Sequence, residues 1–123
     1  MQKEYTISQL IKDLEATVLT DVYQDKIIEN GSCCDMLSWA MAKVTSADCW
    51  FTILSSMNVV AVASLSDCPV VVLTESVVME EAVLSKARSE EICIISTRHT
   101  TFEASGILYT SLARTKAAHV DQV

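Results

Sequence analysis

The chain has 123 residues, of which 50% are hydrophobic and 20% are charged, and its net charge is −7 at pH 7. This length predicts one domain with a sizeable core, whereas the acidic balance argues against nucleic acid, whose phosphates bind clustered Lys and Arg. No apolar run approaches the roughly 18 residues that a membrane span needs, so we expect neither nucleic acid nor a membrane as a partner.

Residues 1–5 lack the basic start and apolar core of a signal peptide, so we expect a cytoplasmic protein. Only two glycines are present, and the glycine-rich nucleotide-binding fingerprints are therefore absent. The cysteines include no C-x-x-C pair and no histidine at zinc-finger spacing; they are Cys33, Cys34, Cys49, Cys68 and Cys93. We expect no structural disulfide, no metal site and no cofactor.

The first third of the chain predicts two helices. Apolar residues at helical spacing predict a helix over 7–16, and Val18, Leu19 and Val22 indicate a short strand. A turn at Glu29-Asn30-Gly31 is expected to hold Gly31 in a left-handed or otherwise strained backbone. A second helix is predicted from about residue 33 to 43, with Ser32 as its cap.

The remainder predicts a parallel α/β sheet. Near-continuous apolar runs at 50–54, 70–73 and 92–95 are typical of strands that helices cover on both faces. Helices are expected at 57–65 and around 79–88, because parallel strands need crossover connections. Thr100 to Glu103 form a capping-box pattern that begins a helix ending near Ala113. We therefore predict a single three-layer α/β domain over 1–114, followed by a polar, fraying tail over 115–123.

Polar side chains follow two of these strands and form the candidate site. In doubly wound sheets, ligands bind beyond the carboxyl ends of the strands, where helix N-termini converge. Arg98 and His99, beside several hydroxyls, could grip a phosphate or a carboxylate; the alternative is a solvated loop that only caps a helix. The candidate ligand-binding residues are Ser55, Ser56, Asn58, Thr97, Arg98, His99 and Thr100, and Thr74, Glu75 and Ser76 would supply another edge of the same rim.

Two catalytic alternatives stay open at this point. Glu75 near His99 could form an acid–base pair, although no nucleophile elbow or metal-ligand spacing accompanies it. Cys33 and Cys34 could act in redox chemistry, since a helix N-terminus lowers the pKa of a thiol. The competing interpretation is that the cysteines are small buried hydrophobes, which we expect of Cys49 and Cys93.

Several motifs together resemble the DRTGG domain family over most of the chain. The matching segments are Asp25-Lys26 with Glu29-Asn30-Gly31, Cys34-Asp35-Met36-Leu37-Ser38, the block from Trp50 to Ala63, and Thr101-Phe102-Glu103 with Gly106 and Leu108. The hallmark is altered, because Lys26 stands where the family has arginine, and Glu29-Asn30 replace its threonine and first glycine.

The resemblance implies a three-layer α/β fold related to the N-terminal domain of HPr kinase/phosphorylase. It also implies a non-catalytic regulatory or ligand-sensing module that assembles as a homodimer or with a protein partner, accessory to an iron hydrogenase or a phosphometabolite system. Self-association is further suggested by Trp39, Met57, Met79 and Tyr109, which one small core would have difficulty enclosing. The expected ligand is small and anionic or nucleotide-like.

Overall fold

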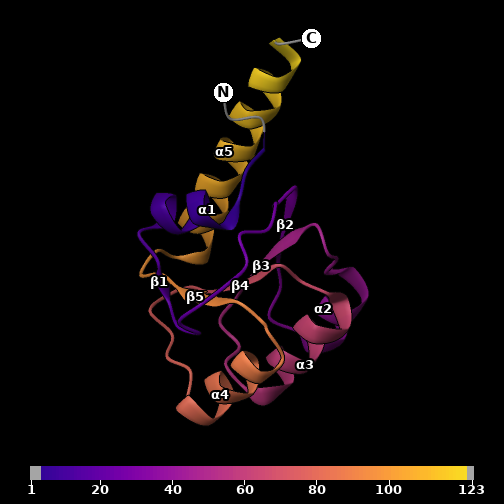
Figure 1. The fold of residues 1–123 in the computed structure, drawn as a ribbon, viewed down its shortest axis with the longest axis vertical. Coiled ribbons are helices and arrows are strands. Elements are labelled where there is room, and N and C mark those ends of the chain that lie inside the picture. Colours follow the sequence, from indigo (N-terminus) through magenta and orange to yellow (C-terminus); the bar gives the residue numbers. More distant parts are fainter. Residues whose placement is uncertain (1–3, 122–123) are drawn as a thin grey trace.

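The computed structural model describes residues 4–121, with side chains up to residue 118. Five strands form one sheet between two layers of helices (Figure 1). The strands are β1 (Thr17–Val18), β2 (Asn30–Cys33), β3 (Asp48–Thr52), β4 (Val70–Leu73) and β5 (Ile94–Ser96), and the helices are α1 (Ile7–Leu14), α2 (Leu37–Lys43), α3 (Met57–Ser66), α4 (Glu81–Ser89) and α5 (Thr101–Asp121).

The sheet has the order β1-β5-β4-β3-β2 and is mostly parallel. Strands β2, β3, β4 and β5 run parallel to one another, and only the two-residue β1 is antiparallel to its neighbour β5. The predicted three-layer α/β fold with a mostly parallel sheet is thus confirmed. Within residues 4–121, β1 and β2 form the two edges of the sheet.

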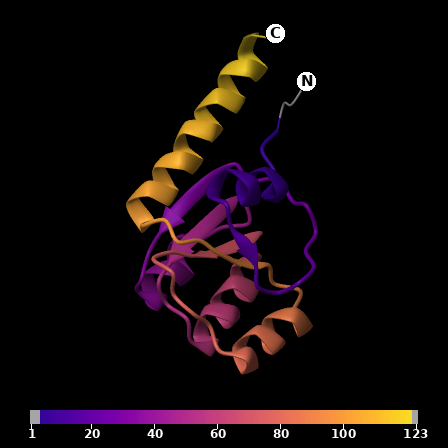
Figure 2. The same cartoon turned by 90° about the vertical axis from the view of Figure 1, so that its left-hand side faces the viewer.

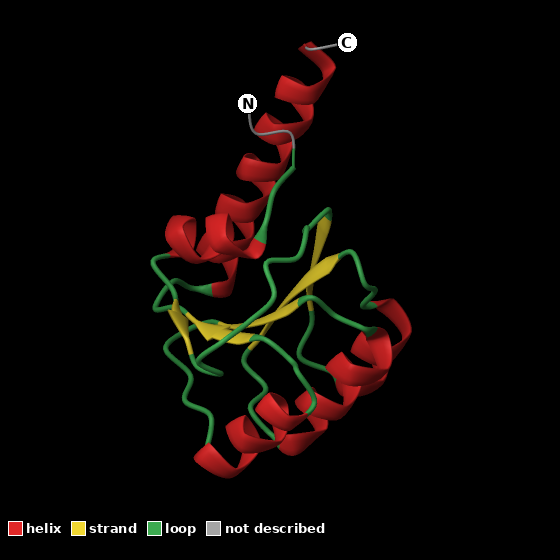
Figure 3. Cartoon of the chain, in the orientation of Figure 1, coloured by secondary structure: helices red, strands yellow, loops and turns green. Residues whose placement is uncertain are grey.

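The two faces of the sheet are covered by different helices (Figure 3). Phe51, Val72 and Ile95 pack with residues of α1 and α5, whereas Trp50 and Val71 pack with residues of α2, α3 and α4. Burying alternate residues on opposite faces explains the near-continuous apolar runs, because neither face of the central strands meets water.

Helix α5 is longer than predicted and extends well beyond the sheet (Figures 1 and 2). It continues past Ala113 to Asp121, since no Gly or Pro interrupts the residues between them. The expected fraying tail is therefore helical as far as Asp121, and residues 122–123 lie outside the described part; the domain boundary at 114 stays a prediction. Among residues 4–121, the helices lack the length or apolar character needed to cross a bilayer.

The segment around Gly31 differs from the prediction. Residues 30–33 form strand β2, with Gly31 opposite Cys49 of β3, and α2 begins only at Leu37. Gly31 has no positive φ, so the predicted strained turn is wrong. Hydrophobic periodicity does not predict this strand, because most of its residues are exposed and its short polar side chains do not alternate with apolar ones.

Candidate functional site

Each of three parallel strands has a buried threonine at its carboxyl end. Thr52 ends β3, while Thr74 and Thr97 directly follow β4 and β5. The Thr52 hydroxyl donates to Asp35 Oδ1 at 2.9 Å, and the Thr97 hydroxyl donates to the Leu14 carbonyl at 3.0 Å. These hydrogen bonds hold the loops in place. The hydroxyl proton of Thr97, a predicted ligand residue, is therefore donated to the protein's own backbone.

The carboxylates of Glu75 and Glu103 accept hydrogen bonds from backbone N–H groups at the start of α5. The Thr100 N–H donates to Glu103 Oε1 at 2.9 Å, and the Glu103 N–H donates to the Thr100 hydroxyl at 3.1 Å, which confirms the predicted capping box. The Thr101 N–H donates to Glu75 Oε2 at 3.0 Å. The hydrogen bond from the Thr100 backbone holds the pKa of Glu103 below its usual range. An anion at this helix start would meet two carboxylates.

The turn at Glu75 and Ser76 borders this helix start. Both residues have a left-handed backbone, with φ values of 60° and 59°, which costs roughly 1–2 kcal/mol per residue relative to the right-handed region. Two hydrogen bonds hold the turn, from the Glu75 N–H to the His99 carbonyl at 2.9 Å and from the Ser76 N–H to the Thr97 carbonyl at 3.2 Å. Strained backbone of this kind is typical of binding sites.

A cleft of about 430 Å³ opens beside the turn, at the carboxyl edge of β5. Its polar lining residues include Glu15, Ser76, Ser96 and Arg98, and Val77 and Met79 are among its apolar ones. Arg98 is exposed, and among the described residues its side chain makes no hydrogen bond or ion pair. The cleft therefore offers an uncommitted guanidinium next to apolar surface.

The predicted residues around the start of α3 lie outside this cleft. Ser56 is the N-cap of α3 and accepts the Val59 N–H through its carbonyl at 3.0 Å, but its side chain makes no capping hydrogen bond. Ser56 and Asn58 are exposed and Ser55 is half-buried. The seven predicted residues thus form two groups, and only Thr97 and Arg98 line the cleft.

The proposed acid–base pair does not form through its side chains. Glu75 directs its carboxylate to the Thr101 N–H, and its contact with His99 is made by the two backbones. The carboxylate nearest to His99 is that of Glu103, with Oε1 3.8 Å from Nδ1. The pairing of Glu75 with His99 is therefore wrong, because the left-handed turn points the Glu75 carboxylate at the helix start.

The thiols lack the surroundings of a redox pair. Cys33 lies in β2 rather than at a helix start, and partial burial raises the pKa of its thiol. The Cys34 thiol donates to the Met36 carbonyl at 3.3 Å. Cys49, Cys68 and Cys93 are buried, as predicted for Cys49 and Cys93. Burial raises the pKa of Cys68 and of Cys93 to about 12.

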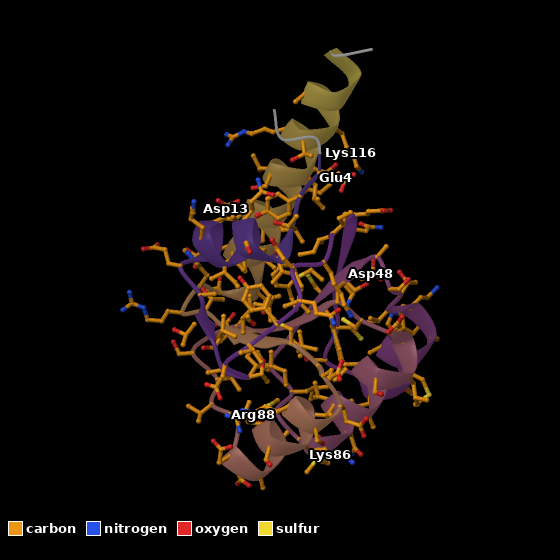
Figure 4. All side chains as sticks on the ribbon, in the orientation of Figure 1. Glu4, Asp13, Asp48, Lys86, Arg88 and Lys116 are labelled. Carbon is orange, nitrogen blue, oxygen red and sulfur yellow. The ribbon has the colours of Figure 1, made fainter. Side chains whose placement is uncertain are left out.

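A larger cavity, of about 520 Å³, lies at the opposite, amino edge of the strands and was not predicted. Its lining includes Lys26 and Arg88 of α4. Arg88 lies at the opposite end of the molecule from Lys116 (Figure 4). Arg88 Nη1 is 2.6 Å from Glu81 Oε2, and Arg88 Nε is 3.1 Å from Asp21 Oδ2. Through Asp21, the Arg88 guanidinium thus links the loop before β2 to α4.

The hallmark aspartate has a structural role. Asp25 Oδ1 accepts the Ser8 N–H at 2.8 Å, and the Lys26 carbonyl accepts the Ile7 N–H at 3.1 Å, so this turn caps the start of α1. The sequence spacing of 17 residues between Asp25 and Ser8 gave no signal for this contact, because capping aspartates are normally adjacent to their helix.

A structure comparison decides the kind of fold. The chain is similar to the regulatory region of Clostridium perfringens pyrophosphatase, solved as its CBS and DRTGG domains in complex with the activator diadenosine tetraphosphate, with a TM-score of 0.64. The fold is DRTGG-like. The match covers 83% of this chain and 45% of the other at 15% identity, so the likeness concerns the fold alone. No protein-family model and no curated protein matches the chain.

Proposed function

We propose that this DRTGG-like domain is a non-catalytic regulatory module that senses a small anionic or nucleotide-like ligand and acts through assembly. The observation that carries the proposal is the cleft of about 430 Å³ beside a strained turn, lined by Arg98, whose side chain has no hydrogen bond or ion pair among the described residues. Clefts at this edge of α/β sheets are the usual ligand sites. The similar pyrophosphatase region, which was solved with a nucleotide activator, supports the same class of role.

The chemistry of the cleft suggests which part of the ligand goes where. A guanidinium binds phosphate or carboxylate through two parallel hydrogen bonds, so Arg98 would hold the anionic group. Val77 and Val78, which also line the cleft, would pack against an apolar or aromatic part. The start of α3 offers a second anchor for an extended ligand, because no side chain caps it and Ser55, Ser56 and Asn58 supply further polar groups.

His99 and Thr100 belong to the proposed rim in a supporting role. The His99 imidazole, 3.8 Å from Glu103, would add positive charge next to Arg98 when it is protonated. Thr100 positions the helix start through its capping box. We further propose a homodimer in the cytoplasm, accessory to an iron hydrogenase or phosphometabolite system.

Thermal unfolding in the presence of candidate ligands tests the proposal. The probes are diadenosine tetraphosphate, ATP, AMP and inorganic phosphate, applied to the wild type, Arg98→Ala and Arg114→Ala. Arg114 is an exposed cation on α5, outside the lining of the cleft, so its replacement is a control for charge. A ligand at about 100 times its Kd adds roughly 2.7 kcal/mol of stability.

We expect at least one nucleotide to stabilise the wild type and Arg114→Ala, and to lose this effect in Arg98→Ala. Equal stabilisation of Arg98→Ala would contradict the assignment of the cleft. No stabilisation by any of these probes would contradict a nucleotide-sensing role.

A further inference from the structure

Strand β2 leaves one row of backbone groups without a strand partner. The N–H groups of Asn30 and Cys34 donate to the Ala47 and Phe51 carbonyls on the β3 side. Because strand backbone alternates, the N–H and C=O groups of Gly31 and Cys33 point away from the sheet. The Gly31 N–H bonds to the Asn30 side chain at 2.9 Å. An exposed edge of this kind is a template for another strand.

One flank of α5 carries exposed aromatic rings. Phe102 is 87% exposed and Tyr109 is 78% exposed, and helical spacing places Gly106 between them on the same side. The opposite flank is occupied, because Ser111 donates to Asp13 of α1 at 3.1 Å. Two large rings at such exposure on a small domain suggest a contact surface.

The strand edge and the helix flank border each other. Leu108 of α5 packs over Gly31, and the Ser105 hydroxyl lies beside the Cys33 thiol. Together they make one continuous surface, which we call the β2–α5 face and which consists of Gly31, Cys33, Phe102, Ser105, Gly106 and Tyr109. None of these residues is charged, on a chain that carries a net charge of −7.

We infer that the β2–α5 face is where a second copy of this chain binds, an inference that rests on the proposed homodimer. A two-fold axis perpendicular to the sheet would pair the two β2 strands antiparallel and join the sheets. The same axis keeps both α5 helices on one side of the joined sheet, where their aromatic flanks face each other.

Charge and area both favour a second copy as the occupant. Two like-charged chains repel each other, so a dimer forms most readily through an uncharged surface. Each aromatic ring buries about 150–250 Å² when it is covered. Phe102 and Tyr109 therefore supply about half of the roughly 800 Å² per partner that a standard interface needs.

Sedimentation equilibrium of the wild type, Tyr109→Glu and Leu65→Glu tests this surface. Leu65 on α3 is 76% exposed and lies outside the β2–α5 face, so Leu65→Glu matches Tyr109→Glu in exposure and added charge. We expect the wild type and Leu65→Glu to be dimers at tens of micromolar, and Tyr109→Glu to associate about tenfold or more weakly, because a charge would be buried at the interface.

Hydrogen exchange of the Cys33 amide gives an independent measure. We expect its exchange to slow as the wild-type protein is concentrated, but not in Tyr109→Glu, because only the dimer would pair this N–H. A wild-type dimer that Tyr109→Glu leaves intact would overturn the β2–α5 face while the homodimer stands. A monomeric wild type would overturn both, and the ligand-sensing role would still be judged separately by the nucleotide experiment.

Discussion

Gly31 of β2 lies directly under Leu108 of α5: a β-carbon added to Gly31 would come within 3.0 Å of Leu108 Cδ2. Leu108 is only 2% exposed, so it has little room to move away. A side chain at this position would have to push the Leu108 side chain aside by a few tenths of an ångström. The glycine therefore favours the close approach of α5 to the sheet rather than an unusual backbone angle.

We predict that Gly31→Val destabilises the domain by about 1–3 kcal/mol through overpacking. In a Leu108→Ala background the valine would have space, so its cost should fall sharply. Urea unfolding of the wild type, both single variants and the double variant measures the coupling. An identical cost of Gly31→Val in both backgrounds would contradict this packing role.

In the same urea experiment, Lys26→Ala, at an exposed position, should change stability by less than about 0.5 kcal/mol.

Asp35 joins the loop before α2 to the end of β3. Its Oδ1 atom accepts the Thr52 hydroxyl and the Ile53 N–H, each at 2.9 Å. Asp35→Ala leaves both donors without this acceptor and should lower the free energy of unfolding by about 1–3 kcal/mol. Asp35→Asn keeps an acceptor and should cost less. Denaturant melts that place the two variants at the same stability would show that the hydrogen bonds do not matter.

The capping box of α5 predicts a loss of stability in acid. The pKa of Glu103 is lowered in the folded protein, chiefly by the hydrogen bond from the Thr100 N–H, so the unfolded chain binds its proton more readily. This contribution is fully present above the ordinary pKa of 4.5 and is lost as the pH falls through the lower folded value.

Urea midpoints measured from about pH 6 to about pH 3 should therefore fall more steeply for the wild type than for Glu103→Gln. The glutamine retains the capping hydrogen bond but cannot titrate. Parallel curves for the two proteins would mean that this carboxylate does not stabilise the helix start.

The cysteines should divide into two reactive and three protected thiols. Cys49, Cys68 and Cys93 are buried, and burial raises their pKa values. At protein concentrations too low for association, a thiol reagent should modify Cys33 and Cys34 alone under native conditions, and Cys33 more slowly than an unperturbed cysteine, because burial also raises its pKa. Fast modification of Cys33 near neutral pH would instead favour the redox alternative.

The elements predicted correctly are those whose own residues carry the signal, either as a continuous apolar run or as a local capping pattern. Val70 to Leu73 is a buried run that can only be a central strand, and Thr100 with Glu103 is a local capping signal. Strand β2 could not be predicted, because its partners in β3 lie 18 positions away in the sequence and its own residues are mostly polar.

The candidate site was predicted in part for the same reason. Arg98 follows a recognisable strand, so its place at the carboxyl edge could be inferred from the sequence alone. The carboxylate of Glu75 at the start of α5 could not, because it depends on two consecutive left-handed residues. Likewise, the cavity at the amino edge is formed by a loop that crosses from Thr20 to Lys26 and has no periodic pattern.

Phosphorus NMR of a nucleotide that stabilises the protein distinguishes a sensor from an enzyme, because one spectrum reports both binding and turnover. With the wild type, we expect the phosphate signals to shift or broaden and no product signal to appear over hours. Arg98→Ala should leave the nucleotide spectrum as it is in buffer. New phosphorus signals that grow with time in the wild type would contradict a sensor and indicate an enzyme.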